Sequence, residues 1–262
     1  MSRLWALQRV TLMTLLCVGC QSHATQSTPP TAQTPVGKLV GHVRLAHAAI
    51  LPRFTDSDLV RKPLRSQTLP TPPAECAEAN RAARTAVAQG ADAALSGIVV
   101  AGSDFVRMPV VERTTYAVVI DHCRLTPSLV AATSGDLLTL ENRDAYDFEP
   151  LIGPTYGAEP LRHGEKRELT LGGASVEVLQ CSLGAPCGRS DLLVFAHPVH
   201  AVTNSAGEFS IDNFPAHELV RVNAWHPLFE PSETFIWIEP GQTSTVSFEL
   251  TPKTRFTDNA AH

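Results

Sequence analysis

The sequence predicts an all-β protein made of two β-sandwiches. From residue 94 onward, apolar and polar residues alternate in short runs with a period of two, which is typical of half-buried strands. Turn signals such as Gly135-Asp136 and Gly172-Gly173 separate these runs at close spacing, as in sandwiches. Only one segment beyond residue 37 has the composition of a good helix.

The predicted strands follow one another along the chain. The first covers 39–45, where Leu39, Gly41, Val43 and Leu45 alternate with Val40, His42 and Arg44. Hairpin turns are predicted at Asn204–Gly207 and Glu239–Gln242. The other strands are expected in two sets, at 97–102, 116–121, 127–133, 136–141, 166–171, 174–181 and 190–196, and then at 199–203, 207–211, 218–225, 233–238 and 243–250.

The predicted helix covers 74–89, an Ala-rich run that Gly90 ends. Residues 46–73 are rich in Pro and charge and are expected to be irregular. The early segment can add an edge strand to either sandwich. We therefore divide the folded chain into a strand and helix segment at 38–91, a first sandwich at 92–197, a second sandwich at 198–252 and a disordered tail at 253–262.

The N-terminus predicts export. A basic start and a short apolar stretch are typical of a secretory signal peptide, here over 1–19, and the stretch is too short to span a bilayer. The segment Leu16-Cys17-Val18-Gly19-Cys20 resembles a bacterial lipobox with Cys20 as the lipidated residue, although its Leu stands one place earlier than usual. An ordinary signal peptide with an unmodified Cys20 is the alternative. Residues 20–37, rich in Ser, Thr, Gln and Pro, predict a flexible tether.

These features place the protein in the cell envelope. Gln21 after the lipidated cysteine favours the outer membrane, with the domains facing the periplasm or the cell surface. We expect the lipid to be the only membrane attachment, because no second apolar stretch is long enough to cross. A net charge of −5 argues against a nucleic-acid partner, which requires a basic face.

The cysteines predict two disulfides. Of the six in the chain, one leaves with the signal peptide and Cys20 takes the lipid, so four remain. An even count in an oxidising compartment favours disulfides, and four cysteines allow three pairings. The short spacing between Cys181 and Cys187 favours that pair and leaves Cys76 with Cys123. Chain entropy alone makes these disulfides worth about 2.4 and about 4 kcal/mol respectively.

Several motifs resemble known families. Residues 120–127 (Ile-Asp-His-Cys-Arg-Leu-Thr-Pro), Gly135-Asp136 and 141–144 (Glu-Asn-Arg-Asp) resemble the cupredoxin-like proteins often labelled methylamine-utilisation-like, and 178–181 is similar to their strand entering the copper-ligand loop. Residues 195–209 and Ala224-Trp225-His226-Pro227 resemble carboxypeptidase-regulatory-like (transthyretin-like) modules. The resemblance implies a cupredoxin-like Greek-key β-sandwich over 92–197 and a smaller transthyretin-like β-sandwich over 198–252.

The same resemblance implies that the copper site is lost. A type 1 copper site needs two His, one Cys thiolate and a weak axial ligand. The resemblance places these ligands at Phe148, Cys181, Gly184 and Cys187, so only one cysteine matches its expected ligand. We therefore expect no metal and no cofactor, and a Cys181–Cys187 disulfide in place of the copper. An alignment shifted by a few residues is the alternative.

Other candidate sites are weaker. His197, His200 and His226 lie near the predicted junction of the sandwiches, where they either bind zinc or copper in a new arrangement or, as we favour, make ordinary hydrogen bonds. Phe235 and Trp237 are expected on the core face of a strand. An acidic run predicts a solvated loop rather than a calcium site, and comprises Asp136, Glu141, Asp144 and Asp147.

The sequence therefore favours a non-enzymatic lipoprotein with a binding or structural role. It contains no Gly-x-Ser-x-Gly motif, and a catalytic cysteine needs a free thiol beside a base. A protein or a glycan is the expected partner. A copper- or zinc-binding protein, or an electron-transfer protein of the cupredoxin type, is the alternative.

Overall fold

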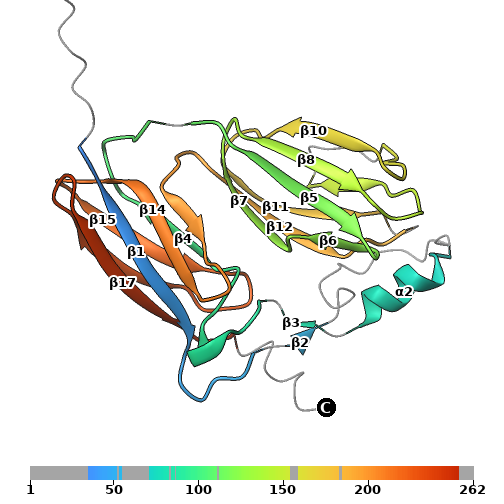
Figure 1. The fold of residues 1–262 in the computed structure, drawn as a ribbon, viewed down its shortest axis with the longest axis horizontal. Helices are drawn as coiled ribbons and strands as arrows, with labels where there is room; N and C mark the ends of the chain where they lie inside the picture. The colour runs from blue at the N-terminus through green and yellow to red at the C-terminus, as the bar shows by residue number, and fades with distance from the viewer. Residues whose placement is uncertain are drawn as a thin grey trace, which may run out of the picture. The chain divides into compact units, whose positions relative to one another are not determined.

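The structure is a computed structural model that describes residues 35–51, 53–54, 71–82, 84–85, 87–110, 112–153, 159–182 and 185–253. Its described part is all-β, with four sheets forming two sandwiches and a small two-stranded sheet, so the predicted fold class is confirmed (Figure 1). Three predictions lie outside the described residues: the signal peptide 1–19, the lipidated Cys20 and most of the 20–37 tether. The predicted 253–262 tail also lies outside the described residues, except for Lys253.

One sandwich is continuous in sequence and is called the inserted sandwich. Its first sheet has the order β10 (Lys166–Thr170), β8 (Leu137–Asn142), β5 (Thr115–Asp121), β6 (Arg124–Thr126). Its second has the order β7 (Leu129–Thr133), β12 (Arg189–Phe195), β11 (Ser175–Cys181), β9 (Pro150–Ile152). Side chains from both sheets form one buried core, and the parallel pairs β5/β8 and β7/β12 show that strands cross over between the sheets.

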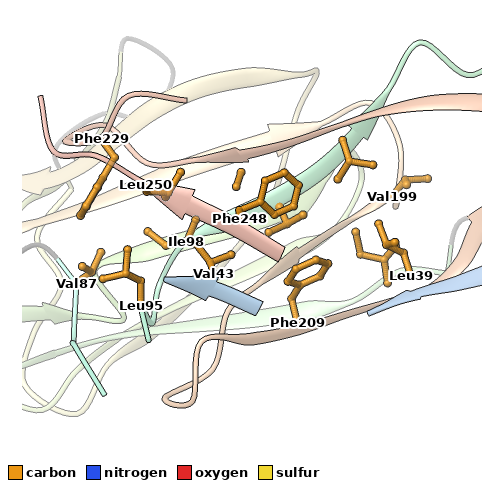
Figure 2. Packing of buried hydrophobic residues seen from close by; sticks show 14 of the residues in the cluster. Leu39, Val43, Val87, Leu95, Ile98, Val199, Phe209, Phe229, Phe248 and Leu250 are labelled. Atoms are coloured by element: carbon orange, nitrogen blue, oxygen red, sulfur yellow. The ribbon is translucent and has the colours of Figure 1, made fainter. Parts of the chain in front are cut away.

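The other sandwich is assembled from both ends of the chain and is called the split sandwich. One sheet has the order β14 (Glu208–Pro215), β1 (Val36–Leu45), β17 (Thr243–Leu250). The other has the order β13 (His200–Val202), β4 (Val99–Ser103), β15 (Leu219–Trp225), β16 (Ser232–Trp237). Figure 2 shows their shared core, in which residues before 100 pack against residues after 198.

The strands β1 and β4 belong to a different part of the fold than the domain boundaries predicted from the sequence imply. The early strand is no edge strand, because β1 lies between β14 and β17 and pairs with both. Gly41 permits this position, since a Cβ there would overlap the ring of Phe209. The strand expected at 97–102, within 92–197, pairs as β4 with β13 and β15 and buries Val100 in the split core. The inserted sandwich therefore interrupts the split sandwich between β4 and β13.

The helix is shorter than predicted. The helix α2 covers Ala74–Arg81, and Ala82 is already extended. Beyond it, Val87 is buried in the core of the split sandwich. The helix preference of alanine is worth only tenths of a kcal/mol per residue, whereas burying a valine is worth about 1.5 kcal/mol or more, so the tertiary contact ends the helix. The remaining short elements are β2 (Arg53–Phe54), β3 (Arg84–Thr85) and the 3-10 turn η1 (Ala91–Ala93).

Most strands of the two sandwiches lie where the alternation predicts them, with two exceptions. The run at 127–133 contains β7, which begins at Leu129, but the short strand β6, just before the chain passes from one sheet to the other, was not predicted. The short strand β9 was not predicted. Both predicted hairpin turns form, since Gly207 N donates to Asn204 O at 2.9 Å and Gln242 N donates to Glu239 O at 3.0 Å.

A small apolar cluster joins the two sandwiches. Val99 of β4 packs with Leu129, Ala131 and Leu193 of the inserted sandwich, and Trp225 of β15 packs against them. Burial of these side chains fixes the contact between the two sandwiches. No helix in the described part of the chain is long and apolar enough to cross a membrane.

Candidate functional site

Both favoured disulfides are present. One joins Cys76 of α2 to Cys123, which follows β5, with 5.0 Å between the Cα atoms. The other joins Cys181, the last residue of β11, to Cys187, with 5.4 Å between the Cα atoms. All four cysteines are buried. The disulfides therefore hold two loops at one end of the inserted sandwich.

The positions that the cupredoxin resemblance assigns to copper lie close to one another but do not fit the metal. Cys181 pairs with Pro150 across β11 and β9, and Ser182 N donates to Glu149 O at 2.9 Å, which places the segment after Phe148 beside Cys181. Phe148 is fully buried in the same core. A phenyl ring offers no ligand atom, and a disulfide sulfur is not a thiolate. The Gly184 position lies outside the described residues.

His197 and His200 are brought together at the contact between the sandwiches. His200 Nε2 lies 3.0 Å from the hydroxyl of Thr133 in β7, and its ring stacks on Phe195 with 4.7 Å between centroids. His197 Nδ1 accepts the backbone N–H of Val199 at 3.3 Å. Burial, then the neighbouring His197, lower the pKa of His200 to about 4, and burial lowers the pKa of His197. Both rings are therefore neutral at pH 7.

His226 is separate from that pair. Its Nδ1 accepts the backbone N–H of Leu228 at 3.2 Å, and its ring meets the edge of Phe229 with 5.6 Å between centroids. Burial, followed by the positive charges of Lys253 and Arg189, lowers the pKa of His226 to about 3. Across the described residues, no group of three or more His, Cys, Asp and Glu side chains is arranged to hold a metal ion.

The acidic run is used mainly for backbone and ion-pair contacts. Asp136 is buried and accepts two backbone N–H groups at 2.9 and 2.7 Å. Asp144 likewise accepts two backbone N–H groups, both at 2.7 Å. Glu141 forms ion pairs with two neighbouring cations, and Asp147 is exposed. Because these carboxylates serve different partners, the run does not form one cluster of oxygen ligands.

A pocket of about 480 Å³ lies between the two sandwiches. The inserted sandwich contributes the segment 124–129 and the start of β12, and the split sandwich contributes the segments near 87, 96 and 202. Volumes of a few hundred Å³ are typical of small-molecule sites. Arg124 and Arg189 are the two charged side chains among the described residues that line it.

The disulfides flank both arginines. Arg124 follows Cys123 directly and donates from Nη2 to the carbonyl of Ala79 in α2 at 2.9 Å. Arg189 follows Cys187 by two residues. Sequence reasoning missed both arginines, because nothing in one sequence shows that residues 124 and 189 line the same pocket. The proximity of each to a paired cysteine was the signal that could have indicated them.

The placement of Phe235 and Trp237 on a core face is wrong. These side chains are 51% and 53% exposed, whereas Ile236 and Ile238 between and after them face inward. Both faces of β16 are apolar, so alternation alone cannot show which face is buried. The exposed rings lie beside the exposed Leu219, which pairs with Trp237 across β15 and β16.

Comparison with models of protein families gives no match, and no curated protein has significant sequence similarity to the chain. Among solved structures, a mutant of amicyanin with Cu(I) is 18% identical, covers 30% of this chain and 79% of its own, and has a TM-score of 0.28. Amicyanin from Paracoccus versutus is 14% identical, with coverages of 30% and 78% and a TM-score of 0.27. Similarity at this level carries no information about the function of this chain.

Proposed function

We propose that the chain is an exported, lipid-anchored protein of the cell envelope that acts by binding a partner, and that its cupredoxin-like sandwich works without copper. The observation that carries this proposal is the Cys181–Cys187 disulfide, together with the buried Phe148. The first removes the thiolate that a type 1 copper site requires, and the second offers no ligand in place of a histidine.

The Cys181–Cys187 disulfide, instead of a metal ion, holds the loop between these two cysteines in place. In a copper protein the metal joins the ligand loop to the neighbouring strands. Here the Cys181–Cys187 bond closes the loop, and the backbone N–H of Leu125 donates to Cys187 O at 2.8 Å. The same region is therefore held by covalent and backbone bonds, which supports a binding or structural role rather than electron transfer.

The composition of the inter-sandwich pocket supports binding rather than catalysis. The described residues that line it include two arginines and several serines and threonines, but no Asp, Glu, His or Cys. General acid and base catalysis depends on groups that titrate near the working pH, and arginine does not. The pocket is thus suited to holding a ligand.

Metal content and thiol content of the exported protein, prepared as residues 21–262, test the absence of copper. We expect no stoichiometric metal after incubation with copper or zinc and dialysis, and no free thiol in denaturant, because the four cysteines are paired. A Cys181→Ser/Cys187→Ser variant serves as the matched control for metal uptake by thiols. One equivalent of copper with an intense blue absorption, or two reactive thiols in the unmodified chain, would contradict the proposal.

A further inference from the structure

We propose that the pocket between the two sandwiches binds a small organic dianion, with Arg124 and Arg189 holding its carboxylate or phosphate oxygens. This inference deepens the proposed binding function and rests on it. Its basis is that two arginines, the first residues of β6 and β12, line one pocket whose described lining contains no carboxylate. Guanidinium groups match the oxyanions of carboxylates and phosphates with paired hydrogen bonds.

Arg124 has hydrogen-bonding capacity to spare. Its side chain is half-buried, and Nη2 donates to Ala79 O at 2.9 Å. Among the described residues, its other N–H groups meet no acceptor and its charge meets no carboxylate. A partly buried cation without a counter-charge is costly, and a bound anion supplies both the charge and the acceptors.

Arg189 contributes a second guanidinium, which forms an ion pair with one carboxylate. Its Nε and Nη2 donate to a single oxygen, Asp191 Oδ1. Lys253 adds another cation nearby, since its charge and that of Arg189 both act on the buried His226, and its Nζ is directed to the carbonyl of Pro227 at 2.9 Å.

The two arginine-bearing segments are held in place before any ligand arrives. The Cys76–Cys123 disulfide fixes the residue before Arg124, and the Cys181–Cys187 disulfide fixes the segment that leads into Arg189. The backbone N–H of Leu125 donates to Cys187 O at 2.8 Å and joins the two segments directly. A site ordered in advance loses less conformational entropy on binding, so a small ligand gains affinity.

The ligand class follows from charge and size. Two arginines among the residues that line one pocket of about 480 Å³ suit a compact molecule with two negative charges. A dicarboxylate and a phosphate monoester share this chemistry. We use succinate as the probe for the first and glucose 6-phosphate for the second, with glucose as the uncharged reference.

Calorimetric titration of the exported protein at fixed ionic strength tests the proposal. We expect saturable binding of succinate or glucose 6-phosphate with one site per chain, and no heat with glucose. Val202 lines the pocket, is 37% exposed and has no polar partner to lose. Val202→Glu places a carboxylate there and should weaken binding by about tenfold or more through repulsion, whereas Val202→Gln, of the same size, should leave it within about twofold.

A second pair of variants examines Arg124, with Arg143 as the control position. Arg124→Gln should weaken binding by about tenfold, and Arg143→Gln should not, because Arg143 pairs with Glu141 on the surface and does not line the pocket. Binding of neither probe, or equal binding by Val202→Glu and Val202→Gln, overturns the anion site. If the protein holds no metal and no free thiol but binds neither probe, only this inference is overturned. If it binds copper with a blue absorption and also binds succinate, only the proposed function is overturned.

Discussion

At the scale of single residues, the buried histidines show how little of their chemistry the sequence discloses. His200 and His226 were candidates for metal ligands because of their residue type and position. In the structure each ring is enclosed and meets its own partner, a hydroxyl in one case and a backbone N–H in the other. Their neutral state is a consequence of burial, and it links the stability of the fold to pH.

His226 makes folding sensitive to acid. Its pKa is about 3 in the folded chain and about 6.5 when exposed, so between these values the unfolded state binds more protons. The free energy of unfolding therefore falls as pH drops below about 6.5, by about 2 kcal/mol at pH 5 from this residue. Urea titrations at pH 7.5 and pH 5 measure the free energy of unfolding at each pH. Its decrease between the two should be smaller in His226→Gln than in the unmodified chain by about that amount. His163→Gln, with an exposed ring, serves as the control, and an unchanged loss in His226→Gln would refute the assignment.

At the scale of elements, β16 separates apolar residues that build the fold from apolar residues that do not. Ile236 and Ile238 pack against the core or lie within it, whereas Phe235 and Trp237 project to the surface beside Arg221, whose guanidinium lies 5.4 Å from the centroid of Phe235. The outer face of this strand is therefore apolar without being buried by the described part of the chain.

Alanine substitutions should distinguish the two kinds of aromatic residue. Phe229→Ala removes a fully buried ring and should lower the free energy of unfolding by about 3–5 kcal/mol. Trp237→Ala removes a half-exposed ring and a 3.1 Å hydrogen bond to Glu239, and should cost no more than about 1 kcal/mol. Urea denaturation measures both. Equal costs would mean that something covers Trp237 in solution.

Local pattern predicts elements well here and predicts their partners poorly. The alternation at 243–250 coincides with β17, because one face of that strand is polar and the other is apolar. The same kind of pattern could not show that β1 is central, since strand pairing depends on contacts about two hundred residues apart. The pocket was beyond prediction for the same reason, because its lining residues come from both sandwiches and lie side by side only in the folded chain.

At the scale of the whole molecule, the chain builds the two sandwiches differently. The inserted sandwich comes from one continuous segment, whereas the split sandwich needs strands from both sides of that segment. β4 and β13 pair directly, with Ala101 opposite His200, so the two ends of the inserted sandwich leave and enter the split sandwich side by side. The domain boundary predicted near residue 92 would assign β1 to a different part of the chain from β14 and β17, the two strands that it pairs with.

Two deletions test this topology. Replacing residues 104–198 with a short Gly-Asn-Gly loop, in a Cys76→Ser background, should leave a folded split sandwich, because the loop closes the β4–β13 hairpin. Removing residues 1–91 should prevent folding, because β14 and β17 lose their shared neighbour. Circular dichroism and cooperative urea unfolding report the outcome. A folded 92–262 chain together with an unfolded excision variant would show that the sandwiches are divided in sequence order.

The parallel pairing of β1 with β17 has a mechanical consequence. Eight residue pairs, from Lys38–Thr243 to Leu45–Leu250, join the two strands. A pull on the chain before β1 and after β17 acts at opposite ends of this pair, so it loads the hydrogen bonds together in shear instead of opening them one at a time. Both connections of the inserted sandwich leave from other strands, β4 and β13, so tension along the chain bypasses it.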